Sequence, residues 1–193
     1  LSIRADMVAF PGHKGLLGAY GTGGLYLNPE VVLDPFREGG TGSSSESTLQ
    51  PSELPERYEG GTLNLAGIAG LLVGTRYVRQ HFEEIAQHER ILAHRLRDGL
   101  LSIPNVTVLS RRMPDVGVVS FNVGDCSSGE IAKMLDGQNI AVRGGLHCAP
   151  EVHRWLGTIG RGAVRASIGP FNTVRDIDAL LYHVSRFARQ ANT

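Results

Sequence analysis

The sequence predicts an α/β fold, and two observations indicate it. Segments with strand-like and helix-like periodicity alternate from residue 79 to residue 193, which is the pattern of a compact α/β lobe. Glycine accounts for 25 of the 193 residues, about twice its usual share of ~7%. We therefore expect several sharp turns, or places where the backbone approaches a ligand closely.

The first 61 residues predict two short strands and two loops. Apolar runs at 7–10 and 24–27 end at Pro-Gly and Asn-Pro dipeptides, which is typical of strands. Between them, residues 12–23 form a loop with five glycines. Residues 37–61 are dense in Gly, Ser, Glu and Pro and show no periodicity. A loop of this length reaches a site or a partner, or else is disordered.

Helical periodicity begins at Leu63 and continues for nearly forty residues. The first helix is rich in small residues, and four apolar side chains share one face: Leu65, Ile68, Ala69 and Leu72. The second helix is longer and amphipathic, and its predicted apolar stripe is Val78, Phe82, Ile85, Leu92 and Leu96. We expect this second helix to connect two lobes.

Strands and helices alternate in the rest of the chain. Strands are predicted at 106–109, 116–123, 140–143 and 163–168. A helix is predicted from the capping-box pair Ser127 and Glu130 to about residue 138, and a shorter one near 152–156. The last helix opens at Thr173, with Asp176 at its third position. Its predicted buried residues are Ile177, Leu180, Leu181, Val184 and Phe187.

Composition argues against several classes of protein. The 19 Lys and Arg residues balance the 19 Asp and Glu residues, so we expect no nucleic-acid partner. The longest uncharged stretch, 60–75, has 16 residues and five glycines, which is too short to cross a membrane. No secretory signal is visible, and two cysteines suit a reducing cytoplasm. Because the chain begins with Leu1 in what reads as mid-domain sequence, we expect a piece of a longer protein.

Lys14 is the first candidate for chemistry. It lies between glycines at the end of a predicted strand, where an amine can reach a cleft and form a Schiff base with an aldehyde cofactor. The alternative is a solvated loop lysine. A phosphate-binding Walker loop and a dinucleotide fingerprint are both excluded, because neither glycine pattern is complete here.

Cys148 is the second candidate. It follows His147 in a glycine-bounded loop that begins at Arg143, and such a thiol can react as the nucleophilic thiolate. One alternative is a buried structural cysteine. Another is a zinc site made of His147, Cys148 and His153, which is disfavoured because adjacent His and Cys cannot easily share a tetrahedral site and the sequence has no Cys-x-x-Cys. Cys126 flanks a helix start without a basic neighbour, so we interpret it as structural.

Four segments together carry a family resemblance. Residues 9–24, Ala-Phe-Pro-Gly-His-Lys-Gly-Leu-Leu-Gly to Gly-Thr-Gly-Gly, resemble the pyridoxal-phosphate lysine loop of the class V aminotransferases. Residues 141–150, Ala-Val-Arg-Gly-Gly-Leu-His-Cys-Ala-Pro, resemble the active-cysteine loop of the cysteine desulfurases and selenocysteine lyases in that family. Residues 58–64 resemble its phosphate-contacting segment, and residues 162–173 its C-terminal strand and turn.

The resemblance implies a cofactor, pyridoxal 5'-phosphate, and three residues that bind it. Lys14 matches the Schiff-base lysine, and His13 matches the neighbour that contacts the cofactor phosphate. Thr62 matches a threonine that reaches the phosphate of the neighbouring subunit, which implies a homodimer. The loop 37–47 resembles a hairpin that lies near the partner's active site.

The resemblance also implies substrate-binding and catalytic residues. Arg143 and Arg165 match positions that hold the substrate carboxylate, a task suited to the guanidinium group. Cys148 matches the thiol that takes sulfur, so the implied catalytic residues are Lys14 and Cys148, and no metal is implied. We expect His147, or another base, to help form the thiolate.

The chain departs from the family pattern in two ways. Ala19-Tyr20 stands where family loops often carry Pro-Gln, which puts a loop contact in doubt. Family chains are also roughly twice as long. The absent N-terminal half would supply the group that stacks on the cofactor ring and the acid that pairs with its nitrogen, so we expect the 193-residue chain alone to be inactive.

These observations combine into one interpretation. Residues 1–74 form the C-terminal part of the large domain of a fold-type-I pyridoxal-phosphate enzyme, and residues 75–193 form its small α/β domain. The predicted activity is a cytoplasmic cysteine desulfurase that converts L-cysteine or L-selenocysteine and passes sulfur to an acceptor protein for iron–sulfur cluster or thio-cofactor assembly. The alternatives are a class V aminotransferase or selenocysteine lyase that uses Lys14 without persulfide chemistry, and a non-catalytic fragment.

Overall fold

The computed structural model describes residues 4–43, 46–110 and 112–190. The chain divides into two units, Leu1–His81 (unit 1) and Phe82–Thr193 (unit 2), and each is described by itself. Residues 1–3 of the predicted first domain, and residues 44 and 45 of the predicted loop 37–47, lie outside the described residues.

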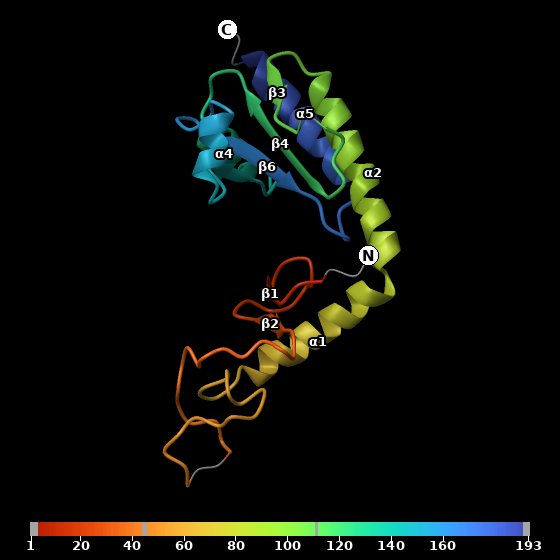
Figure 1. The fold of residues 1–193 in the computed structure, drawn as a ribbon. Coiled ribbons are helices and arrows are strands. Elements are labelled where there is room, and N and C mark those ends of the chain that lie inside the picture. The colour runs from red at the N-terminus through yellow and green to blue at the C-terminus, as the bar shows by residue number, and fades with distance from the viewer. Residues whose placement is uncertain (1–3, 44–45, 111, 191–193) are drawn as a thin grey trace. The chain divides into compact units, whose positions relative to one another are not determined.

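Unit 1 contains a β-hairpin and a helix (Figure 1). Strand β1 (Met7–Pro11) pairs with β2 (Gly23–Leu27) in antiparallel register, so that Phe10 lies opposite Gly24. Helix α1 spans Leu65–Gln80, and its cap Asn64 accepts a hydrogen bond from the Gly67 amide at 3.0 Å. The domain boundary predicted between residues 74 and 75 falls within α1.

The predicted apolar stripe of the second helix is wrong at its start. Helix α1 ends at Gln80, and α2 begins at Phe82 and runs to Leu101. The backbone of His81 has a ψ of 19°, which departs from helical geometry and breaks the run. Val78 therefore belongs to α1, and Phe82 is 59% exposed. The buried face of α2 consists of Leu92, Ala93, Leu96 and Leu100.

Unit 2 is built on a four-stranded antiparallel sheet in the order β3-β4-β6-β5 (Figure 1). The strands are β3 (Val106–Val108), β4 (Val118–Val123), β5 (Arg143–Gly145) and β6 (Ala163–Ser167). The helices after α2 are α3 (Ser128–Asp136), α4 (Pro150–Trp155) and α5 (Val174–Gln190). The α/β fold class is thus confirmed.

The strand predicted at 140–143 lies further along the chain. Ile140 and Val142 are apolar and pack against the core outside the strand, whereas Arg143–Gly145 pairs with β6. A Cβ at Gly144 would lie only 2.5 Å from the Ser128 carbonyl oxygen. Glycine therefore allows β5 to approach the start of α3, although β-branched content favoured the earlier residues.

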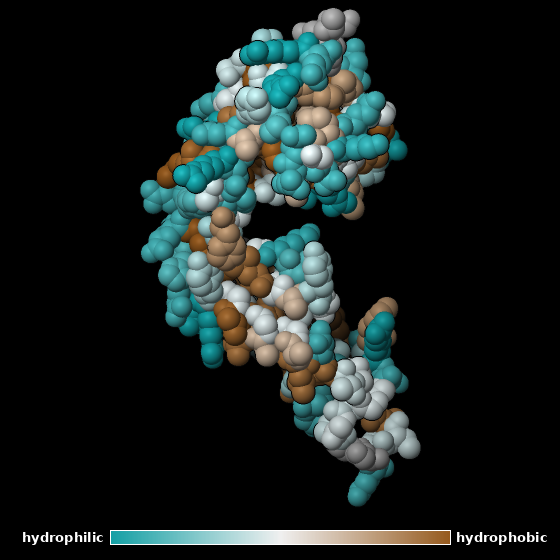
Figure 2. All heavy atoms as spheres, turned by 180° about the vertical axis from the view of Figure 1, so that it is seen from behind, coloured by the Kyte–Doolittle hydropathy of each residue, from teal (hydrophilic) through white to brown (hydrophobic). Residues whose placement is uncertain are grey.

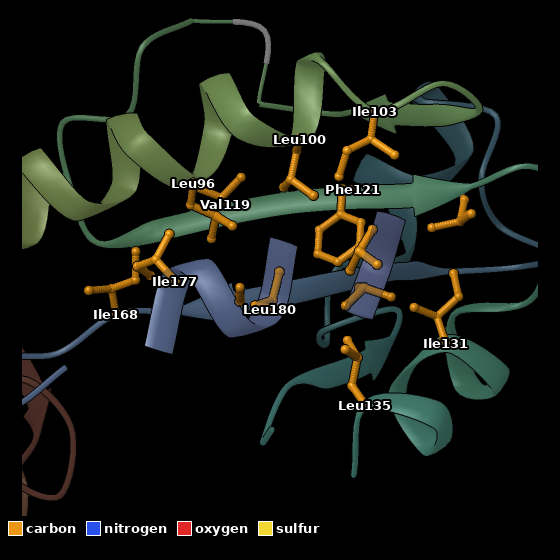
Figure 3. Packing of buried hydrophobic residues seen from close by; sticks show 14 of the residues in the cluster. Leu96, Leu100, Ile103, Val119, Phe121, Ile131, Leu135, Ile168, Ile177 and Leu180 are labelled. Atoms are coloured by element: carbon orange, nitrogen blue, oxygen red, sulfur yellow. The ribbon is translucent and has the colours of Figure 1, made fainter. Parts of the chain in front are cut away.

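One hydrophobic core lies between the sheet of unit 2 and helices α2, α3 and α5 (Figure 3). Phe121 of β4 and Val164 of β6 are fully buried in it. The predicted capping box of α3 is confirmed, since Ser127 and Glu130 bond each other's backbone amides. Ile177, Leu180 and Val184 of α5 are buried as predicted, and no described helix is long and apolar enough to span a membrane.

Unit 1 carries exposed apolar side chains. Figure 2 shows hydrophobic residues at the surface in the part of the chain that contains α1. In α1, Leu65 is 70% exposed and Val73 is 67% exposed, while only Gly67 and Gly74 are buried. On the apolar face predicted for this helix, Ile68 is also 44% exposed and Leu72 is 49% exposed, so the described residues of unit 1 leave this face largely uncovered.

Candidate functional site

Lys14 lies in the turn that joins β1 to β2. The turn is closed by three backbone hydrogen bonds, from Gly12 to Thr22, from Gly18 to Gly12, and from Leu17 to Lys14, at 2.8 to 2.9 Å. Lys14 and His13 are both exposed. The His13 ring stacks on Tyr20, with ring centroids 5.2 Å apart. The Lys14 side chain is thus exposed to solvent, while hydrogen bonds within the turn hold its backbone.

Glycines at the contact allow this turn to pack closely against α1. A Cβ at Gly18 would lie 2.8 Å from the Gly12 carbonyl oxygen and from Leu71, and a Cβ at Gly74 would lie 2.3 Å from the Leu16 carbonyl oxygen. Real Cβ atoms do not come so close, so the contact exists only because these residues are glycines. The lysine turn therefore packs directly against the backbone of α1 at its small residues.

Thr62 lies in the segment that leads into α1, and it is exposed. The preceding Gly61 has a φ of +90°, and its amide donates to the Gly40 carbonyl at 2.8 Å. Among the described residues, no hydrogen bond joins Thr62 to His13 or Lys14. Its role toward a neighbouring subunit stays a prediction.

Cys148 lies in unit 2, in the turn between β5 and α4. Its side chain is exposed, and its backbone is left-handed with a φ of +61°. His147 before it is also left-handed, with a φ of +53°. The Ala149 amide closes the turn by donating to the Leu146 carbonyl at 2.9 Å, and Pro150 then starts α4.

Two arginines flank this turn. Nη2 of Arg143 lies 3.9 Å from Sγ of Cys148. Arg143 is also the cross-strand neighbour of Arg165 on β6, so both side chains project from the same face of the sheet. Arg165 is half-buried, and its Nε is buried without a hydrogen-bond partner among the described residues. Two adjacent cations with a free donor form a suitable site for a carboxylate.

Arg165 lines a cavity of about 270 Å³ on this face of unit 2. His147, Ser110 and Ser120 contribute polar walls to it, and Val152 and Leu156 contribute apolar ones. The sequence-predicted residues Arg143, Arg165 and Cys148 are therefore brought together in unit 2, while His13 and Lys14 are neighbours in unit 1.

His147 does not contact the thiol as a base would. Its Nε2 lies 3.0 Å from the Ala163 carbonyl oxygen, and its Nδ1 is buried without a partner. Burial lowers the pKa of His147, the bond to Ala163 opposes this, and the nearby Arg165, His153 and Arg143 lower it further. The contact to Sγ comes from Arg143 instead, and the expectation that His147, or another base, assists the thiol stays a prediction.

The other sequence interpretations have clear positions in the structure. Cys126 is half-buried and packs against the core, which is consistent with a structural role. Nδ1 of His153 lies 2.8 Å from the Thr158 hydroxyl. Within residues 4–43, 46–110 and 112–190, no three His, Cys, Asp or Glu side chains gather as a metal site.

Sequence reasoning missed Ser128. Its side chain is 2% exposed, and its hydroxyl donates to the Arg161 carbonyl at 2.8 Å and accepts from the Gly145 amide at 2.9 Å. It therefore ties the start of α3 to both β5 and the segment before β6. The only signal in the sequence is its place beside the capping residue Ser127, which drew attention to the cap alone.

The chain matches the family model described as aminotransferase class-V over residues 2–180. It belongs to that family. A probable cysteine desulfurase from Pyrococcus abyssi is 37% identical over 93% of the chain and 46% of its own length. A cysteine desulfurase from Salmonella agona is 31% identical over 97% of the chain and 47% of its own length. This class-V aminotransferase chain thus spans about half the length of the curated relatives it matches.

Solved structures agree with the sequence relatives. A cysteine desulfurase from Escherichia coli has a TM-score of 0.83 and 31% identity, over 96% of this chain and 46% of that one. This chain therefore has the fold of about half of that cysteine desulfurase.

Proposed function

We propose that the protein containing this chain is a pyridoxal-phosphate-dependent cysteine desulfurase. One observation carries the proposal: the exposed Cys148 thiol lies 3.9 Å from the Arg143 guanidinium, beside a second arginine on the neighbouring strand. A nucleophilic sulfur next to a carboxylate-binding pair is what a reaction on the sulfur of an amino acid requires. The names of the relatives support the same activity.

The chemistry of the side chains in unit 1 fits the cofactor. Lys14 offers a primary amine for its aldehyde, and His13 offers a ring nitrogen for its phosphate. The close contacts of Gly18 and Gly74 fix the backbone of the turn that carries this amine. Thr62 would bind the phosphate in a second copy of the protein, which makes the active enzyme a homodimer. When bound, pyridoxal 5'-phosphate supplies an electron sink for the substrate Cα.

Arg143 and Arg165 would bind and orient the substrate. Their guanidinium groups each present several donors in a fixed plane, so the pair can hold the carboxylate of L-cysteine while Arg143 keeps one edge toward Sγ. Binding in this way places the substrate sulfur near Cys148 and turns the attack into a step within one complex.

Lys14 and Cys148 would carry the proton and sulfur transfers. The Lys14 amine moves the proton at the substrate Cα. The Cys148 thiolate attacks the substrate sulfur, so that the bond between Cβ and sulfur breaks, an S–S bond forms on Cys148, and the Cβ carbon takes a proton to give alanine. The Cys148 persulfide then passes its terminal sulfur to an acceptor protein.

The cellular context is also part of the proposal. We infer a cytoplasmic enzyme that supplies sulfur for iron–sulfur cluster or thio-cofactor assembly. L-Selenocysteine is an alternative substrate, because selenium follows the same transfer chemistry. The support is the presence of two free cysteines, Cys126 and Cys148, which suit a reducing compartment.

The test compares products from the longest form of the protein that its gene encodes, loaded with pyridoxal 5'-phosphate. We expect alanine and protein-bound persulfide from L-cysteine in equal amounts. Amino transfer to an oxo acid, without persulfide, would instead show an aminotransferase. Alanine and elemental selenium from L-selenocysteine alone, with the selenium recovered as selenide when a thiol reductant is added, would show a selenocysteine lyase. The absence of all three activities would show a non-catalytic protein.

A further inference from the structure

The turn that carries Cys148 has an unusual backbone. Gly145, His147 and Cys148 all have positive φ angles, of +123°, +53° and +61°. Two consecutive residues with side chains in the left-handed region are uncommon, and such backbone persists only where the surroundings hold it. The groups that hold this turn therefore determine where the thiol of Cys148 lies.

Two hydrogen bonds from outside the turn hold it. The Gly145 amide donates to the buried Ser128 hydroxyl at 2.9 Å, and Nε2 of His147 lies 3.0 Å from the Ala163 carbonyl oxygen. Ser128 begins α3 and Ala163 begins β6. The turn is thus attached to two rigid elements of unit 2, one at each side of Leu146.

The Ala163 bond also fixes the proton on the His147 ring. A carbonyl oxygen only accepts hydrogen bonds, so Nε2 carries the proton and Nδ1 holds the lone pair. That lone pair is buried and makes no hydrogen bond with any described residue. Burial lowers the pKa of the ring, and the charges of Arg165, His153 and Arg143 lower it further. The one basic nitrogen of the neutral ring is therefore enclosed and makes no hydrogen bond with Sγ.

We propose that His147 is a positioning residue, which holds Cys148 in its left-handed turn through the bond to Ala163 and does not act as a base on the thiol. Ser128 holds the other end of the same turn. This proposal rests on the proposed function in one respect, the role of Cys148 as the nucleophile. The hydrogen bonds that hold the turn are properties of this chain and do not depend on that function.

The test separates the two roles with a conservative substitution. In His147→Gln the side-chain amide keeps a donor for Ala163 but cannot titrate, whereas His147→Ala loses both properties. Ser128→Ala is the matched variant, since it releases the turn without changing a titratable group. Two measurements need neither cofactor nor substrate: hydrogen exchange at the Gly145 and Ala149 amides, and the pH profile of Cys148 alkylation by iodoacetamide, located by peptide mass spectrometry.

We expect His147→Gln to keep the wild-type exchange rates and the wild-type midpoint of alkylation. His147→Ala and Ser128→Ala should each exchange about five-fold faster, which is the effect of one hydrogen bond of ordinary net strength. The proposal is overturned if His147→Gln and His147→Ala shift the alkylation midpoint equally while Ser128→Ala leaves it unchanged, or if His147→Ala leaves exchange unchanged. Should His147→Ala fail to fold, His147→Gln and Ser128→Ala still decide. Absence of desulfurase activity would alter neither measurement.

Discussion

The Arg143 guanidinium lies against the Cys148 thiol, with Nη2 3.9 Å from Sγ, and Arg143 faces Arg165 across two paired strands. One arginine thus touches the nucleophile, and both can bind a carboxylate. Their effects on the thiol and on substrate binding should be separable, because only Arg143 contacts the sulfur.

Replacing each arginine by alanine should separate these effects. Arg165→Ala should raise the KM for L-cysteine about ten- to hundredfold, the effect of losing a hydrogen bond to a charged group, and should leave Cys148 alkylation unchanged. Arg143→Ala should raise the KM similarly and also slow alkylation at neutral pH, since the cation facing Sγ is lost. Equal alkylation rates in both variants would show that the contact with Sγ has no chemical effect.

The two cysteines should differ sharply in function. Cys148→Ser should leave cofactor binding intact and abolish persulfide formation, because the thiol acts as the nucleophile. Cys126→Ser is the matched control, and it should keep persulfide formation because Cys126 packs against the core. Persulfide can be measured by alkylation and mass spectrometry. Wild-type sulfide release from Cys148→Ser would show that this thiol is structural.

Lys14 should be the residue that binds the cofactor aldehyde. Borohydride reduction in the presence of pyridoxal 5'-phosphate should place the pyridoxyl label on Lys14, whose amine is exposed on the glycine turn. The chain has one other lysine, Lys133, on the surface of α3. Peptide mapping distinguishes the two. Label on Lys133, or label that persists in Lys14→Ala, would remove the assignment.

The fold could be predicted where local patterns and tertiary packing agree. The capping box of Ser127 and Glu130 follows from local hydrogen bonds and is confirmed. The face of α5 follows from periodicity: three of its five predicted residues are buried, and Leu181 and Phe187 are partly buried against the core. The start of α2 and the position of β5 could not be predicted, since His81 and Gly144 act through backbone geometry and close packing. Neither effect leaves a periodic pattern in the sequence.

The candidate site could be predicted as residue types but not as contacts. Arg143 and Cys148 are marked by their glycine-bounded loop, yet only the fold shows that they touch. Adjacency of His147 to Cys148 in sequence does not give the direction of its ring nitrogens, and only the fold shows the contact of Nε2 with the Ala163 carbonyl oxygen. Ser128 contacts the turn from 17 residues away in sequence, so no local motif could identify it.

Two glycines of α1 should respond in opposite ways to alanine. Gly74→Ala should displace the Lys14 turn, because its Cβ would lie 2.3 Å from the Leu16 carbonyl oxygen, and overpacking of this kind costs about 1–3 kcal/mol. Gly70→Ala meets nothing within 4 Å and should stabilise the helix by about 0.5–1 kcal/mol. Thermal unfolding and Lys14 labelling measure both effects. Equal labelling of Lys14 in the two variants would show that packing against α1 does not position the turn.

His147 should make the stability of unit 2 depend on pH. Burial, with the nearby cations, holds its folded-state pKa below the ordinary value of 6.5. The unfolded chain therefore binds a proton more readily than the folded chain, so stability should fall as the pH drops through 6.5 toward the lower pKa of the folded state. Carboxylates also make stability depend on pH, and burial raises the pKa of Glu89, for example. Their contribution should be the same in wild type and in a variant without His147.

The difference between wild type and His147→Gln isolates this contribution. The variant keeps a donor for Ala163 but has no ring to protonate, so its free energy of unfolding should fall less with decreasing pH than that of the wild type. Urea unfolding followed by circular dichroism at several pH values measures this difference. Parallel pH profiles would mean that the folded ring accepts its proton as easily as the unfolded one, which would contradict an enclosed Nδ1 among Arg143, Arg165 and His153.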